Sequence, residues 1–387
     1  MNDISLFFQS VEPLEPISGS LGDRIIYHTD GDFPLIEKNS IAIFYVPEFR
    51  NGKPHYHNKS DDGFRAALAN YFDATNWSFT IYDLGNIIPG NTVEDTYFAV
   101  KQVVSELIKL GSIPLVIGGT QDLTVPMYLG YEHTEQLVNI MSVDNRFDLG
   151  DPEEPLKEDQ FVNKLLMHRP CFLFNYSVLG IQAPLVRSEE MELFENLHFD
   201  TIRLGEYVSD RKVAEPYLRN ADILTLDLGA IRASEWQNTT YGEPNGFFHA
   251  DICQIARYAG ISDKLSSFGI FNVIPEGFGP ADHALVAQLI WYFIDGVANR
   301  MHDFPIGSKK DYTKFTVLVD GFEDQMIFYK SPRSDRWWME VPYPSTSESK
   351  YTRQTIVPCS KSDYDKAVKG ELPVLWWKTY KKLGLPS

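Results

Sequence analysis

Three aspartates lie where short apolar segments of the chain end. Asp144 and Asp148 follow one such segment, and Asp227 closes another. In a parallel α/β sheet ligands bind at the carboxyl ends of the strands, so these carboxylates are expected to meet at one edge. Clustered carboxylates provide the hard oxygen ligands that divalent metal ions prefer. The pattern predicts a candidate site for metal-assisted hydrolysis, but the imidazoles and the further aspartate that a two-ion site needs are missing beside it.

A structural explanation of these aspartates stays open, because aspartates after strands also cap helices and anchor loops. Other chemistries find little support in the chain. The segment GGTQD lacks the Lys-Ser/Thr ending of a phosphate loop, and there is no Gly-x-Ser-x-Gly motif. The histidines are dispersed, and the three cysteines have no metal-type spacing.

The elements that would position these residues alternate between apolar β-rich runs and amphipathic helices. This order predicts a mostly parallel sheet with helices on both faces. We expect strands at residues 40–47, 77–85, 113–119, 137–144, 172–181, 222–229 and 266–275. We expect helices at 61–72, 92–111, 188–197, 250–260 and 282–299, the second with Thr92 as its N-cap and Gly111 as its end.

Composition divides the chain unevenly. The net charge of the 387 residues is −18, yet residues 305–387 hold 14 Lys and Arg against 10 Asp and Glu. Residues 1–304 therefore carry a net −22, which argues against nucleic-acid partners. We expect an N-terminal extension (1–39) with a strand near 24–28, a main α/β domain (40–304) and a small C-terminal α+β module (305–387).

The C-terminal module is rich in tryptophan, with Trp337, Trp338, Trp376 and Trp377. Its sequence predicts a hairpin turning at Asp320-Gly321, a third strand at 336–343 and a helix interrupted near 370–373. The first two tryptophans complete the core of the module in one interpretation. In the other they anchor a contact between subunits.

Four segments, in order, resemble the arginase/ureohydrolase superfamily, and the formimidoylglutamase branch is the most similar. They are VPEFRNGKPHYHNKSDDGFRAAL (46–68), LVIGGTQDLTVP (115–126), SVDNRFDLG (142–150) and LTLDLGAIR (224–232). The resemblance covers about residues 40–299. It implies a three-layer arginase-like fold and a pair of manganese ions bridged by a hydroxide that attacks a guanidino or formimino carbon.

Several positions depart from the pattern of that family. Asp144, Asp148 and Asp227 match its aspartates. Other residues occupy the positions of the remaining ligands: Gln121 and Arg146 replace histidines, and Gly229 replaces an aspartate. Asn272 replaces the glutamate that binds the substrate in that family. Shifting the first segment by one residue would instead offer Asp122 as a ligand. On this alignment half of the six metal ligands are absent.

Arg146 is the most informative of these replacements. Alternate residues of a strand share a face, so its guanidinium is expected beside Asp144 and Asp148. A guanidinium does not ligate a metal but can fork onto carboxylates. We expect Arg146 to take the place of the ions by neutralising Asp148 together with Asp227 or Asp144. Removing it would then destabilise the fold by on the order of 3–5 kcal/mol.

Two functions remain open at this stage. The leading one is a binding or scaffolding protein, without a cofactor, that has lost the manganese pair and its hydrolysis. The alternative is a manganese-dependent hydrolase of formimino or guanidino C–N bonds that uses Asp144, Asp148 and Asp227, with or without Asp122. We expect a cytoplasmic homo-oligomer that is not inserted in a membrane, with a protein partner bound through the C-terminal module.

Overall fold

The computed structural model describes most of the chain. The described residues are 3–12, 14–52, 63–74, 76–151, 153–236, 242–274, 278–305, 309–319, 325–342 and 356–384.

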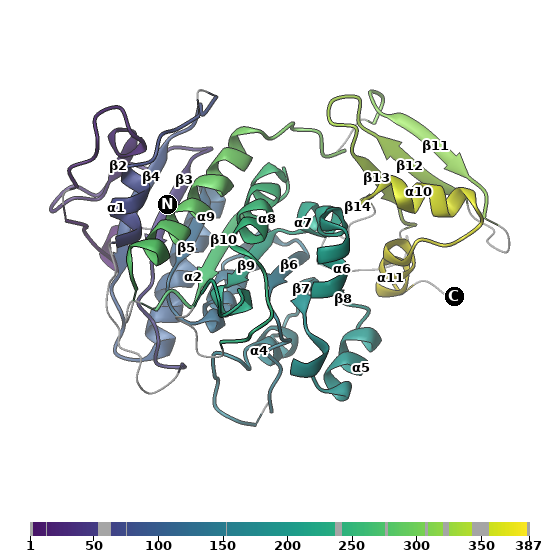
Figure 1. Ribbon diagram of the computed structural model, residues 1–387, viewed down its shortest axis with the longest axis horizontal. Coiled ribbons are helices and arrows are strands. Elements are labelled where there is room, and N and C mark those ends of the chain that lie inside the picture. Colours follow the sequence, from purple (N-terminus) through teal and green to yellow (C-terminus); the bar gives the residue numbers. More distant parts are fainter. Residues whose placement is uncertain are drawn as a thin grey trace.

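A ten-stranded sheet, counted over these described ranges, forms the centre of the molecule (Figure 1). Its strands are β1 (Phe8–Gln9), β2 (Ile25–Tyr27), β3 (Ile41–Tyr45), β4 (Ile81–Ile87), β5 (Ile113–Ile117), β6 (Val138–Val143), β7 (Leu173–Ile181), β8 (Asp200–Arg203), β9 (Ile223–Asp227) and β10 (Ser267–Phe271). Their order is β1-β4-β3-β5-β10-β9-β6-β7-β8, and β2 also pairs with β4. Only β1 runs antiparallel to its neighbour. The predicted, mostly parallel sheet is confirmed.

Helices cover both faces of this sheet. They are α1 (Gly63–Ala69), α2 (Val93–Leu110), α3 (Thr124–Leu129), α4 (Val162–Met167), α5 (Ser188–Asn196), α6 (Leu204–Ser209), α7 (Glu215–Asn220), α8 (His249–Ile261) and α9 (Pro280–Ala298). Side chains of α1, α6, α7, α8 and α9 share one apolar core with the sheet, and those of α2, α3, α4 and α5 share a second core. The strands between the two cores are buried on both sides, which explains their unbroken apolar runs.

The longest predicted helix of the first half begins and ends as its sequence indicates. The Thr92 hydroxyl accepts the backbone N–H of Asp95 at 3.2 Å, and the Asp95 carboxylate accepts the backbone N–H of Thr92 at 2.9 Å. This reciprocal pair satisfies two N–H groups that the first turn leaves open. Gly111 ends α2 with a φ of 77°, a left-handed conformation that glycine adopts without steric cost.

The N-terminal residues belong to the same sheet. β2 lies inside the expected 24–28 strand and pairs with β4 in parallel, while β1 pairs with the end of β4. Residues 8–27, which we expected to form an extension, therefore complete one edge of the sheet.

The C-terminal residues form a separate antiparallel sheet with two helices. Its elements are β11 (Thr313–Val317), β12 (Met326–Lys330), β13 (Trp337–Glu340), β14 (Ile356–Cys359), α10 (Lys361–Val368) and α11 (Val374–Lys382). The two strands of the predicted hairpin pair as expected, while its Asp320-Gly321 turn lies outside the described residues. Trp337 and Trp376 pack in the core of the module, and Trp338 is also fully buried.

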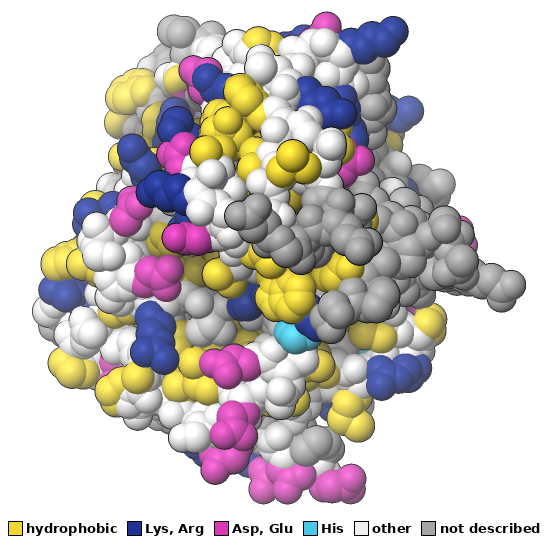
Figure 2. Space-filling model, turned by 90° about the vertical axis from the view of Figure 1, so that its right-hand side faces the viewer, with side chains coloured by type: hydrophobic (Ala, Val, Ile, Leu, Met, Phe, Trp, Pro, Cys, Tyr) yellow, Lys and Arg dark blue, Asp and Glu magenta, His cyan; other side chains and the backbone are white. Residues whose placement is uncertain are grey.

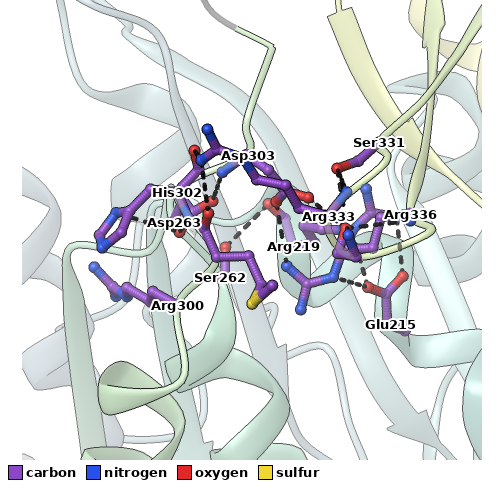
Figure 3. Close-up of polar contacts among 12 residues, drawn as sticks. Glu215, Arg219, Ser262, Asp263, Arg300, His302, Asp303, Ser331, Arg333 and Arg336 are labelled. Atoms are coloured by element: carbon purple, nitrogen blue, oxygen red, sulfur yellow. Dashed lines mark hydrogen bonds and ion pairs between the residues drawn. The ribbon is translucent and has the colours of Figure 1, made fainter. Parts of the chain in front are cut away.

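Arg219 joins this module to the main sheet through α7. Its guanidinium donates to the backbone oxygens of Trp337 at 2.9 Å and Cys359 at 3.0 Å, on β13 and β14. It also forms a two-pronged ion pair with Glu215 (Figure 3). Its Cζ lies 4.7 Å from the centre of the Trp338 ring. Because Arg219 is only 4% exposed, these contacts form a buried junction between the two sheets.

The surface carries mixed charge on the side of the C-terminal module. In Figure 2 the Lys and Arg side chains of this face are scattered among Asp and Glu side chains, with hydrophobic side chains between them. Within the described ranges, none of the helices combines the length and apolar character that crossing a bilayer requires.

Candidate functional site

The predicted site residues meet at the carboxyl ends of four neighbouring strands. Gln121 follows β5, Asn272 follows β10, Asp227 ends β9 and Asp144 follows β6. A small cavity of about 20 Å³ lies between them. Its wall consists of polar side chains and one glycine: Gln121, Asp144, Asn145, Arg146, Asp148, Glu158, Asp159, Asp227, Gly229 and Asn272.

Asp144 and Asp148 form a buried carboxyl pair. Asp144 is 2% exposed and Asp148 is 8% exposed. Burial raises the pKa of Asp144, while a hydrogen bond from Asp148 and the backbone N–H of Arg146, at 2.9 Å, act to lower it. Burial and the charge of Asp144 raise the pKa of Asp148 well above its usual range. Repulsion between two buried carboxylates thus favours the protonated form of Asp148.

Asp148 also departs from the extended geometry that we assumed. β6 ends at Val143, and Asp148 has a φ of 51°, in the left-handed region. The chain therefore turns between Asp144 and Asp148, and this turn, rather than strand alternation, brings the two carboxyls together.

Asp227 is held by groups from two loops. Its Oδ1 accepts the backbone N–H of Gly229 at 2.7 Å and the side-chain amide of Asn272 at 2.7 Å. Burial, followed by the charge of Asp144, raises the pKa of Asp227 to about 7, although both hydrogen bonds act to lower it. Asp227 thereby caps the short 3-10 turn Leu228–Ala230, so the loop-anchoring explanation left open above also applies to it.

A side chain at Gly229 would require the Asp227 carboxyl group to shift. A Cβ atom added there would lie 2.8 Å from Asp227 Oδ2. The carbonyl of Gly229 accepts the side-chain amide of Asn145 at 3.1 Å, which fixes the turn to the loop after β6.

The side chains of Gln121 and Asp122 lie in different surroundings. Gln121 is 2% exposed, lines the cavity and donates through Nε2 to Ser142 Oγ at 3.1 Å. Asp122 instead accepts the side-chain amide of Asn51 at 2.8 Å and the hydroxyl of Tyr97 through Oδ2. Asp122 is not among the residues of the cavity wall, and the rearranged ligand set that included it stays a prediction.

Arg146 lines the cavity but is directed toward its rim. Its Nη2 forms an ion pair with Glu243 Oε1 at 2.8 Å, and about a quarter of each side chain is exposed. The positive charge lowers the pKa of Asp227, but burial and Asp144 have larger effects. Arg146 thus pairs with Glu243 and acts on Asp227 through its charge, and the expected neutralisation of Asp148 together with Asp227 or Asp144 stays a prediction.

Sequence reasoning missed several members of this site. Glu158 and Asp159 line the cavity from an irregular loop, and Glu243 lies in another loop. Their segments have neither periodicity nor a motif, so only the folded chain brings them here. Arg232, the last residue of the segment 224–232, lies over the Phe248 ring with its Cζ 3.8 Å from the ring centre.

The described residues include no group of three or more His, Cys, Asp and Glu side chains placed to hold one metal ion. The site that they do form is a buried acidic cluster. It can hold a proton between carboxyl groups, and it presents an arginine–glutamate pair at its rim.

Comparisons with known proteins agree on one family. A model described as "Arginase family" matches residues 58–294. The chain is 28% identical over 193 residues to a formimidoylglutamase of Rhodococcus jostii, covering 46% of this chain and 59% of that protein. It is 22% identical over 243 residues to one of Streptococcus gordonii, covering 58% of this chain and 72% of that relative. The match thus spans about three fifths of the length of the Rhodococcus relative.

Solved structures show the same fold at low identity. A Bacillus subtilis formimidoylglutamase superposes with a TM-score of 0.65 and 14% identity, covering 77% of this chain and 98% of that one. A Trypanosoma cruzi formiminoglutamase solved with Mn²⁺ gives a TM-score of 0.62 and 17% identity, covering 67% and 94%. The arginase-like architecture predicted from the sequence is confirmed.

Proposed function

Because the chain belongs to the arginase family, we propose that it is a member without the manganese pair and its hydrolysis, which acts as a binding or scaffolding protein. One observation carries this proposal. Gln121, Arg146 and Gly229 stand at the three positions beside the aspartates and bring no imidazole, and the further carboxylates of the cavity wall, Glu158 and Asp159, come from a separate loop. A site for two divalent ions needs such ligands around both metals.

The arrangement of the aspartates supports the same conclusion. Asp227 already accepts two N–H groups on one oxygen, and Asp144 accepts the N–H of Arg146. The positive charge of Arg146 beside the cavity further disfavours a dication. The residues present do not fit a pair of manganese ions.

The second candidate is a hydrolase of formimino or guanidino C–N bonds. Two observations favour it: the similar curated proteins are formimidoylglutamases, and three carboxylates of the motif stay together in one cavity. In that case one ion held by Asp144, Asp148 and Asp227 would supply the activated water.

Metal analysis separates the two candidates. The full chain is purified without chelator, dialysed against excess Mn²⁺ and then against metal-free buffer, and its metal content is measured. Our proposal predicts well under one ion per chain and no hydrolysis of formimidoylglutamate, arginine or agmatine above a blank.

Variants make the result decisive. Asp227→Asn and Asp144→Asn remove candidate ligands, and Asp311→Asn is the matched change at an exposed aspartate. Stoichiometric manganese, or hydrolysis, that the first two variants abolish and the third retains would establish the hydrolase instead.

A further inference from the structure

A second and larger cavity lies at the opposite end of the main sheet. Its volume is about 500 Å³, within the range of about 300–1,000 Å³ that small-molecule sites occupy. The wall is built from the segments that lead into β3, β4 and β5, together with the end of α9 and the residues after it. The aspartate site lies at the carboxyl ends of the strands, so the two cavities are separate.

Three basic side chains line this cavity: Lys38, Arg300 and His302. Arg300 is held rigidly, because its Nε donates to Gly260 O at 2.9 Å and its Nη2 donates to Leu265 O at 2.8 Å. In Figure 3 the side chains of Arg300 and His302 extend to the same side, away from the Arg219 junction. Arg300 is thus fixed in orientation, whereas the His302 side chain is 81% exposed.

The charge of Arg300 has little compensation in the protein. Burial lowers the pKa of Arg300 to about 10, and Asp263 is the charged group that acts against this change. Asp263 is also engaged by the backbone N–H groups of His302 at 3.1 Å and Asp303 at 2.8 Å. The carboxylate in the cavity wall, Glu37, accepts the hydroxyl of Thr80 at 3.2 Å.

The backbone around the cavity is unusual as well. Seven non-glycine residues of the described ranges have left-handed φ values. Two of them, Asp148 and Asn272, belong to the aspartate site, and two others, Asn39 at 56° and His302 at 49°, line this cavity. Such conformations cost energy and concentrate at ligand sites.

We propose that this cavity binds a small oxyanion, the phosphate or carboxylate group of a metabolite, between Arg300, Lys38 and the ring of His302. A guanidinium with fixed orientation presents its remaining N–H groups to an oxyanion without further loss of side-chain entropy. Asp263 already acts on the charge of Arg300, and the anion would add negative charge on the side of the cavity, where Lys38 also lies. This binding does not depend on the proposed loss of hydrolysis.

Calorimetric titration of the full chain with sodium phosphate and, separately, sodium succinate tests the proposal at constant ionic strength and pH 7. We expect saturable binding of one anion per chain for at least one of the two. Binding of phosphate alone assigns a phosphate ligand, and binding of succinate alone assigns a carboxylate.

Matched variants locate the binding. Asn39→Asp places a negative charge in the cavity without changing side-chain size, and asparagine and aspartate both tolerate the left-handed backbone there. Asn196→Asp makes the same change at an exposed position of α5. The first should weaken binding at least about tenfold, which corresponds to about 1.4 kcal/mol, and the second should leave it unchanged.

Two further variants make the result independent of one substitution. Ser78→Asp adds a charge at an exposed position of the cavity wall, and His302→Asn removes the ring but suits the left-handed backbone. Both should weaken binding while the melting temperature stays unchanged. Absence of saturable binding for both anions, or equal binding by the Asn39 and Asn196 variants, would overturn the proposal.

Discussion

At the residue scale, the charge state of the aspartate site depends more on its carboxyl groups than on Arg146. Asp144, Asp148 and Asp227 share a buried space, and the pKa of each is raised. Arg146 forms an ion pair with Glu243 at the rim. Protonation rather than a positive side chain therefore reduces the negative charge of the aspartates, and the stability of the site should depend on pH.

This balance predicts that Asp227→Asn affects stability only at higher pH. The pKa of Asp227 rises from 3.8 to about 7 on folding, so the folded state holds an extra proton between these values. The unfolding free energy of the wild type should therefore increase as pH falls from 8 to 5. Asparagine avoids the buried charge, so the variant should be more stable than the wild type at pH 8, by on the order of 1–4 kcal/mol, and similar at pH 5.

Urea unfolding at both pH values measures this difference, with Asp311→Asn as the control at an exposed aspartate. A variant destabilised equally at pH 5 and pH 8 would show that Asp227 is needed as an ionised hydrogen-bond acceptor.

Replacing Arg146 should lower the unfolding free energy by less than we expected from the sequence. The pair with Glu243 is partly exposed, with side-chain exposures of 25% and 24%, and such pairs contribute about 1 kcal/mol or less. Arg146→Ala should therefore lower the unfolding free energy by about 1 kcal/mol and raise the pKa of Asp227, which carboxyl NMR titration can follow. A loss of 3–5 kcal/mol would restore the earlier expectation of an arginine that neutralises buried carboxylates.

At the element scale, α7 connects the two sheets of the molecule. Arg219 on α7 is buried, and its donors reach the backbone of β13 and β14 (Figure 3). Ser331 to Arg336, between β12 and β13, approaches the same region: Arg336 lies 3.6 Å from Glu215 and 3.7 Å from Asp303. The junction is therefore a network, and its central residue should have a large effect on stability.

We expect Arg219→Ala to lower the unfolding free energy by about 3–5 kcal/mol. The variant leaves Glu215 without its two-pronged partner and removes the donors to two buried carbonyl groups. Arg187→Ala is the matched control, because Arg187 makes a similar pair with Glu190 at 68% exposure and should change stability by less than about 0.5 kcal/mol. Equal effects of the two substitutions in urea unfolding would contradict a buried junction.

At the scale of the whole molecule, tryptophan side chains of the C-terminal module pack within the same chain. Trp337 and Trp376 lie in its core, and Trp338 is covered from the side of α7 by Arg219. Lys378 of α11 donates to the backbone oxygen of Phe199 at 2.7 Å, beside β8. The module and the main sheet should therefore unfold together.

Scanning calorimetry of the full chain should show one cooperative transition. Removing residues 304–387 uncovers α7 and leaves Arg219 without its backbone acceptors, so the shortened chain should melt at a lower temperature or aggregate. Two separate transitions in the full chain, or an unchanged main transition after the truncation, would show that the module folds independently.

Much of this architecture could be predicted from the sequence, because the hydrophobic periodicity of a long segment identifies it as a helix or a strand. The strands around the site and helices such as α2 and α9 lie close to the expected ranges. Short elements such as β8 and α6 were missed, since four to six residues contain too little periodicity to be recognised. The gathering of Gln121, Asp144, Asp227 and Asn272 followed from the rule that ligand sites form at the carboxyl ends of parallel strands.

The details that the sequence could not provide depend on loops. The direction of Arg146 is set by Glu243, and that of Asp122 by Asn51 and Tyr97, all from distant segments. A pattern of residue types along one segment contains no information about which distant loop will supply a partner. Side-chain direction at the ends of strands was therefore less predictable than position.

The turn at Gly229 couples any new side chain at that position to Asp227. An added Cβ atom would lie 2.8 Å from Asp227 Oδ2, so the carboxyl group would have to shift, while its Oδ1 accepts the N–H groups of Gly229 and Asn272. A designer wishing to rebuild a catalyst on this scaffold would need to remodel the loops after β9 and β10 at the same time.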